Sequence, residues 1–312
     1  MKKLILISTI LFLTGIYSGF AQDDDAPDAP KQSNLLEFTP SKLLYKGQVD
    51  IKWFNNLFTT TTFVNEDGDR FSTGGRQNFF TSSLEVFFGV SKNRRINIGF
   101  ITEFRSNTIG GGGVFDVFQF DGETGVSRSG LTTIGPSIKW QPFKNVKNFS
   151  IQNTIFIPLI DNEVEQNVFL DEKTFVIQNR FFYDYVFPGK KFQTFVDLNT
   201  ELNLGREREF FTDANGFFNT SEGGFANNSL RITYSGFLSY FPSPKWTLQV
   251  LSQQFFLIDL GNDFDQNFTT VGAGVKYQLT NELSIETLYT NFFRARDANT
   301  GQTFNIGLRL II

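Results

Sequence analysis

The 312-residue chain has no cysteine and no histidine, and it has a single methionine. Without cysteine it forms no disulfide bonds. Without histidine it lacks the side chain whose pKa best suits acid–base catalysis, and without either residue it lacks the preferred ligands of transition metals. The net charge of −4 provides no basic surface for nucleic acid. We therefore expect a protein that is not an enzyme, holds no cofactor or metal ion, and does not bind nucleic acid.

Phenylalanine is abundant, with 40 residues, and like Thr, Ile and Val it favours β-strands. The mean hydropathy of −0.17 is ordinary for a soluble protein. A membrane β-barrel has a similar value, because only alternate residues of each strand face lipid. Hydropathy alone therefore does not separate the two classes, and the pattern along the chain has to decide.

The first 21 residues have the order of a secretory signal peptide. Two lysines precede an apolar run from Leu4 to Phe20, and Ala21 supplies the small residue before the cleavage site. A membrane anchor that stays attached is the alternative. Residues 22–45 begin acidic and proline-rich, which predicts a disordered linker. The remaining residues, 46–312, are expected to form one β domain.

Twelve strand-like segments fill that domain, and no helical period interrupts them. They cover residues 46–64, 76–91, 95–106, 129–141, 148–160, 173–187, 190–204, 228–241, 245–259, 267–279, 283–294 and 302–312. Short turns alternate with longer polar loops, which include 65–75 and 295–301. Such alternation is typical of outer-membrane barrels, whose turns face the periplasm. The sequence therefore predicts an all-β fold: a 12-stranded antiparallel up-and-down transmembrane β-barrel in the cell outer membrane.

Apolar and polar residues alternate within most segments, so that one set faces lipid and the other faces the lumen. In 190–204, for example, Leu198 is in the apolar set and Asn199 in the polar set. Segments 52–62 and 246–257 alternate less clearly, and their facing stays open. The residues expected to line the lumen are Glu85, Glu103, Arg105, Lys139, Arg180, Asp184, Asp197, Asn199, Glu201, Arg231, Lys276, Glu286, Arg294 and Arg309. They either pair and fill a closed barrel or line a water-filled pore.

Aromatic residues recur beside the short turns. The stretch Ser239–Leu251 shows this, because Tyr240 and Phe241 precede a Pro-Ser-Pro turn and Trp246 follows it. Amphipathic rings prefer the membrane–water interface. We therefore predict an aromatic girdle at the periplasmic rim, whose members are Trp140, Tyr185, Phe187, Tyr240, Phe241, Trp246 and Tyr277. Ordinary aromatic enrichment in a soluble sandwich is the alternative.

Several motifs resemble those of bacterial outer-membrane barrels. The last strand, Phe304 to Ile312, is similar to the signal that the barrel assembly machinery reads, although it ends in Ile where an aromatic residue is usual. Three motifs, at 129–131, 135–140 (Gly-Pro-Ser-Ile-Lys-Trp) and 157–159 (Ile-Pro-Leu), are similar to the transporter barrels named for the MetA pathway of phenol degradation. That resemblance implies a barrel and a solute that is apolar or aromatic.

The expected function is that of an outer-membrane channel or transporter passing small solutes. Its expected partners are outer-membrane lipid, the barrel assembly machinery during biogenesis, and a small-molecule solute. The alternative from a different class is a non-transporting structural or adhesin-like barrel that binds a partner through its long outer loops.

Overall fold

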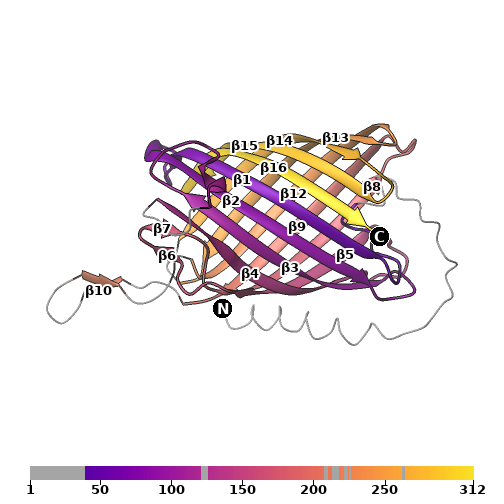
Figure 1. The fold of residues 1–312 in the computed structure, drawn as a ribbon, viewed down its shortest axis with the longest axis horizontal. Coiled ribbons are helices and arrows are strands. Elements are labelled where there is room, and N and C mark those ends of the chain that lie inside the picture. Colours follow the sequence, from indigo (N-terminus) through magenta and orange to yellow (C-terminus); the bar gives the residue numbers. More distant parts are fainter. Residues whose placement is uncertain are drawn as a thin grey trace.

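A closed antiparallel β-barrel makes up most of the chain in the computed structural model (Figure 1). The structure describes residues 39–120, 126–206, 210–212, 218–220, 224, 226–261 and 264–312. The predicted signal peptide and most of the predicted linker therefore lie outside the described residues. The barrel strands are β1 (Val49–Val64), β2 (Arg70–Gly89), β3 (Ile96–Thr108), β4 (Ser127–Trp140), β5 (Phe149–Pro158), β8 (Phe175–Val186), β9 (Phe192–Leu204), β12 (Asn228–Ser243), β13 (Trp246–Asp259), β14 (Asp265–Gln278), β15 (Leu283–Arg296) and β16 (Ala298–Ile311).

Each barrel strand pairs with the strands before and after it, and β1 pairs with β16 to close the ring. The predicted fold class and all twelve predicted strand segments are confirmed. The connections predicted at 65–75 and 295–301 are much shorter than predicted, because β2 begins at Arg70 and β15 and β16 leave only Asp297 between them. Two small hairpins form separate two-stranded sheets that are not part of the ring. They are β6 (Val164–Glu165) with β7 (Val168–Phe169), and β10 (Phe210–Thr212) with β11 (Phe218–Thr220).

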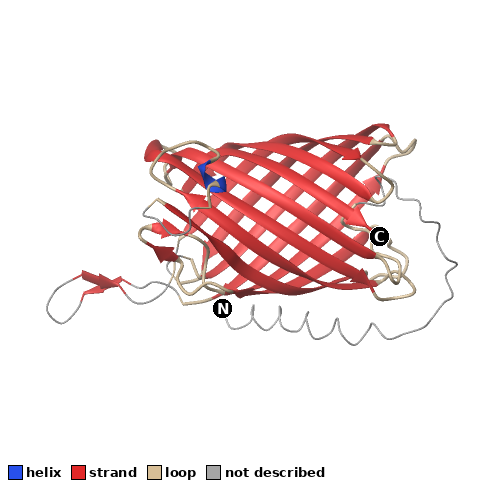
Figure 2. Cartoon of the chain, viewed as in Figure 1, coloured by secondary structure: helices blue, strands red, loops and turns tan. Residues whose placement is uncertain are grey.

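The two ends of the barrel differ (Figures 1 and 2). The short turns, the C-terminus and residues 39–48 share one end, which we call the turn end; the longer connections form the loop end. In outer-membrane barrels the short turns face the periplasm. The only helix among the described residues is the one-turn 3₁₀ helix η1 (Asp116–Phe118), and none there is long and apolar enough to cross a membrane.

Side chains alternate between the two faces of the barrel wall, as a period of two requires. On β9 the apolar residues Val196 and Leu198 pair with Tyr183 and Phe181 of β8 on the outer face. Outward residues elsewhere are large and exposed, including Ile98, Ile138, Val250 and Phe304. The wall is therefore apolar outside and polar inside, the arrangement expected of a membrane barrel.

All seven residues of the predicted aromatic girdle lie at the turn end. The rings of Trp246 and Tyr277 meet across β13 and β14 with centroids 4.5 Å apart. The rings of Tyr185 and Phe187 approach to 5.2 Å. Trp140 donates its indole N–H to the side-chain oxygen of Asn153 at 2.9 Å. Such a band suits the membrane interface, where the rings meet apolar tails and their polar atoms meet water.

The connection between β3 and β4 folds back over the barrel wall and carries η1 (Figure 2). Val117 of η1 is fully buried against Leu57 of β1 and Phe80 of β2. Leu57 and Phe80 are cross-strand partners, as are Trp53 and Leu84 four residues further along the same two strands. Trp53 faces outward, so Leu57 and Phe80 face outward as well. The described residues 109–120 of this connection therefore cover the outer face of the barrel near the loop end.

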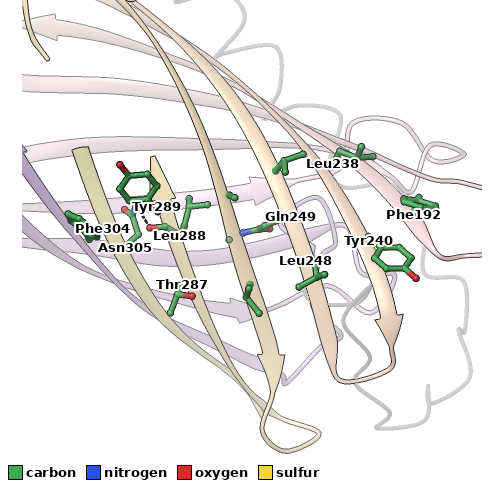
Figure 3. A pocket seen from close by; sticks show the side chains of 14 residues that line it. Phe192, Leu238, Tyr240, Leu248, Gln249, Thr287, Leu288, Tyr289, Phe304 and Asn305 are labelled. Carbon is green, nitrogen blue, oxygen red and sulfur yellow. Dashed lines mark hydrogen bonds between the residues drawn. The ribbon is translucent and has the colours of Figure 1, made fainter. Parts of the chain in front are cut away.

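An open apolar groove of about 740 Å³ lies on the outer face of β12 to β16 (Figure 3). Tyr240, Leu248 and Phe304 line it, and the small Ala273 of β14 leaves space between larger neighbours. Because it is lined mainly by outward side chains, the groove belongs to the surface that faces lipid and not to the lumen.

Replacing Leu198 with Arg should oppose insertion, because it places a charge on the lipid face; near the midplane the cost is about 2–4 kcal/mol. Asn199→Arg is the matched control, since Asn199 pairs with Arg180 and Thr233 on the inner face and should cost far less. Refolding of both variants into liposomes under a urea titration measures the difference. Equal losses would contradict the assigned faces of β9.

Candidate functional site

The inner wall of the barrel carries thirteen of the fourteen residues predicted to line the lumen. Cross-strand partners share a face of the sheet. Each of these residues lines a cavity inside the barrel, or belongs to a strand whose pairing places it on the same inner face. They are Glu85, Glu103, Arg105, Lys139, Arg180, Asp184, Asp197, Asn199, Glu201, Arg231, Lys276, Glu286 and Arg309.

Arg294 is the exception, and the reason is a β-bulge. Phe292 pairs with Thr270 and Arg294 pairs with Thr269, so Phe293 between them has no partner on β14. A bulge moves every later residue to the opposite face. Arg294 is therefore exposed on the outer face near the loop end, and its predicted place in the lumen is wrong.

Four ion pairs on the inner wall connect neighbouring strands. Lys276 Nζ lies 2.8 Å from Glu286 between β14 and β15. Arg309 lies 2.7 Å from Asp50 between β16 and β1, and Lys52 lies 3.6 Å from Glu85 between β1 and β2. On the other side of the ring, Arg180 of β8 pairs with Asp197 of β9. These charges are thus matched by partners on neighbouring strands along the wall.

A cavity of about 70 Å³ lies between these charged side chains in the turn-end half of the lumen. Its lining comes from nine barrel strands and includes Asp50, Lys52, Gln152 and Phe182, which the sequence analysis did not identify. For Asp50 and Lys52 a signal was available, because they alternate with the apolar Ile51 and Trp53 at the start of β1. Gln152 and Phe182 lie in the polar phase of segments that were read correctly.

Residues 39–45 extend across part of the turn end and pack against the inner wall. Ser41 is fully buried and hydrogen-bonds to Asp184 of β8, and Lys42 Nζ lies 3.3 Å from the same carboxylate. Gln193 of β9 donates to Thr39 at 3.0 Å. On β3, Asn97 accepts a hydrogen bond of 3.2 Å from the backbone of Leu44. This part of the predicted linker therefore has a fixed position in the turn-end opening.

Gly89, at the end of β2, provides the space for this segment. A Cβ atom at Gly89 would lie 2.0 Å from the carbonyl oxygen of Tyr45, which no side chain tolerates. Arg94, in the next turn, lies over the Tyr45 ring at 3.6 Å and donates to the carbonyl of Leu43 at 2.8 Å. The turn end therefore provides a shaped seat for residues 43–45.

The connection between β5 and β8 folds over the loop end and reaches the inner wall. Asp171 lies 3.1 Å from Arg105 of β3, while the adjacent Glu172 pairs with Arg231 of β12. Four strands separate β3 from β12 in the ring, so these two contacts reach nearly opposite walls. Burial raises the pKa of the Glu172 carboxyl, against the opposing attraction of Arg231.

The same connection is anchored through its hairpin. Asn107 of β3 donates to the carbonyls of Phe169 and Leu170 at 2.8 and 2.9 Å. Arg128 of β4 lies 3.2 Å from Glu165. Val168 is fully buried. Residues 161–174 therefore form an ordered cover over the loop end of the lumen.

A row of five inward phenylalanines lines the wall between the charged cavity and the loop end. The centroids of successive rings lie 4.6 to 5.9 Å apart, and the row crosses β2, β1, β15, β14 and β13. Each ring is half-buried and so presents a face to the lumen. The members are Phe79, Phe58, Phe292, Phe268 and Phe255. This Phe row gives the lumen a continuous apolar surface on one side.

Arg231→Met should loosen the cover over the loop end, because it removes the partner of Glu172. Losing a partly buried charge-assisted contact costs about 1–3 kcal/mol, so exchange of the amides of 163–172 should accelerate about tenfold or more. Lys276→Met is the matched control, since it breaks a wall ion pair on β14 and β15 and should leave those amides unchanged. Hydrogen exchange read by mass spectrometry decides, and unchanged exchange in Arg231→Met would contradict the anchoring.

No family model and no curated protein matches the chain. Solved structures do match over nearly the whole chain. The COG4313 outer membrane channel from Pseudomonas putida F1 has a TM-score of 0.61 and 12% identity, covering 88% of this chain and 98% of that one. The beta domain of the Bordetella autotransporter BrkA has a TM-score of 0.52 and 10% identity, with 86% and 100% covered. The chain is therefore similar in fold to barrels of bacterial outer membranes.

Proposed function

We propose that the protein is an outer-membrane channel that passes small solutes and that two of its own segments close it in the conformation described. The observation that carries this proposal is the arrangement of the inner charges. Pairs such as Lys276 with Glu286 join neighbouring strands along the wall, and the charged side chains leave a cavity of about 70 Å³ between them. A purely structural barrel gains stability by filling its interior with packed side chains.

The obstructions at the two ends support the same function. Residues 39–45 lie across part of the turn end, and residues 161–174 cover the loop end. Neither belongs to a barrel strand, so either can move without breaking the hydrogen bonds of the ring. Lumen closure by movable segments is a property of gated channels.

The Phe row supports a solute with an apolar part. Half-buried rings at stacking distance offer a continuous surface on which an apolar or aromatic group can move without binding tightly. The paired charged side chains nearer the turn end can form polar contacts with the polar part of the same molecule. A small solute with apolar and polar groups suits both surfaces.

Recordings in planar bilayers test the channel. The full mature chain should show rare openings, and removal of residues 39–44 should increase the open time, because it frees the turn-end opening. Removal of residues 23–28 shortens the chain equally upstream of the seat and should leave the openings rare. Absence of conductance in all three proteins would instead support the non-transporting barrel that binds a partner through its outer loops.

Phe292→Ser tests the Phe row, because Phe292 contacts both Phe58 and Phe268. In liposome swelling, phenyl glucoside should enter faster than methyl glucoside through the unmodified protein. The variant should reduce that preference about three- to tenfold, the value of one or two aromatic contacts. Phe293→Ser removes the exposed neighbour in the bulge and should change nothing. An unaltered preference in Phe292→Ser would contradict a role for the row.

A further inference from the structure

Two buried donors on adjacent strands line the turn-end cavity and have no hydrogen-bond acceptor among the described residues. Lys139 of β4 and Gln152 of β5 are cross-strand partners and both line the cavity. They are 6% and 2% exposed, so neither reaches bulk solvent. Within the described residues, Gln152 Nε2 has no hydrogen-bond partner. Buried donors without acceptors are rare and costly, which makes the pair a candidate binding site.

Lys139 is distinct from the other cations around the cavity. Lys52, Arg309, Lys276 and Arg180 each have a carboxylate partner on a neighbouring strand. Within the part of the chain that is described, no carboxylate lies within ion-pair distance of the Lys139 ammonium, which sits over the Phe182 ring, 4.8 Å from Nζ. The carboxylates of Asp50 and Glu85 line the same cavity, but Arg309 and Lys52 hold them. Lys139 is therefore the one basic side chain lining the cavity that has no carboxylate partner within the described residues.

We propose that Lys139 and Gln152 form a binding site for a carboxylate group. The inference rests on the proposed channel function, because the solute must reach the lumen, and it adds the chemical class of that solute. A carboxylate offers one oxygen to the Lys139 ammonium and the other to the Gln152 amide. The negative charge of such a ligand also supplies the partner that Lys139 lacks on the wall.

The neighbouring wall suits the rest of such a ligand. Phe182 lines the cavity and stacks on Phe195 of β9 at 6.0 Å, and Phe195 lies 5.7 Å from Phe237 of β12. Phe182 is buried, and the half-buried rings of Phe195 and Phe237 extend from it as a second apolar surface on the inner wall. A small monocarboxylate with an apolar body therefore matches both parts of the site, the head on Lys139 and the body along the rings.

Anomalous diffraction from crystals of the full mature chain soaked in sodium bromide locates the anion site. Bromide should give a peak between Lys139 and Gln152. The peak should disappear in Lys139→Met and persist in Lys147→Met, which removes the same charge from an exposed turn residue. Surface peaks without one in the cavity would overturn the proposal.

Competition in solution separates a carboxylate site from one for inorganic halide alone. The NMR signal of bromide should broaden when the protein in detergent is added. Acetate should reverse this broadening, and the uncharged acetamide should not. If acetate fails to compete, the site takes halide only and the carboxylate assignment is wrong.

Gln152→Glu provides a second test of the site if Lys139→Met does not fold. Its own carboxylate should pair with Lys139 and weaken bromide binding about tenfold or more, the loss expected for a charge-assisted contact. Undiminished binding would overturn the site. None of these measurements needs an open channel, so their failure is distinguishable from an absence of conductance, which bears on the proposed function.

Discussion

The pairing of β1 with β16 is the constraint on which the rest of the structure depends. In hydrocarbon an unpaired backbone group costs several kcal/mol, so a sheet crosses a membrane only when it has no free edge. The register from Asp50 opposite Ile311 to Val64 opposite Ala298 closes the ring along the full length of both strands. Closure fixes an inside and an outside, and every strand must then alternate between lipid and lumen.

That alternation explains why the fold and most of the inner wall were predictable. Segments such as 190–204 alternate between apolar and polar residues, so the faces of Leu198 and Asn199 follow without knowledge of the neighbouring strands. Arg294 was misplaced because one unpaired residue, Phe293, reverses the phase, and nothing in the local pattern marks it. Asp50 and Lys52 were not predicted, because the alternation of apolar and polar residues becomes irregular in the middle of their segment, 52–62.

The closing segments were not predictable, since they depend on contacts distant in sequence. Ser41 meets Asp184, and Asp171 meets Arg105, only after the ring has brought their strands together. An acidic, proline-rich start reads as disordered linker, and composition does not show that its far end has a seat beside Gly89. The lumen therefore combines a wall encoded by local pattern with two covers encoded by long-range complementarity.

We propose that the lumen is a passage that the N-terminal segment, residues 39–45, closes at the turn end. Because the chain has no cysteine, Ser41→Cys with Asp184→Cys introduces a single pair of thiols at a contact present in the closed conformation. Single-channel recording of this variant should show a silent protein when the disulfide is formed and openings after addition of a reductant. Equal conductance in the oxidised and reduced states would contradict the account.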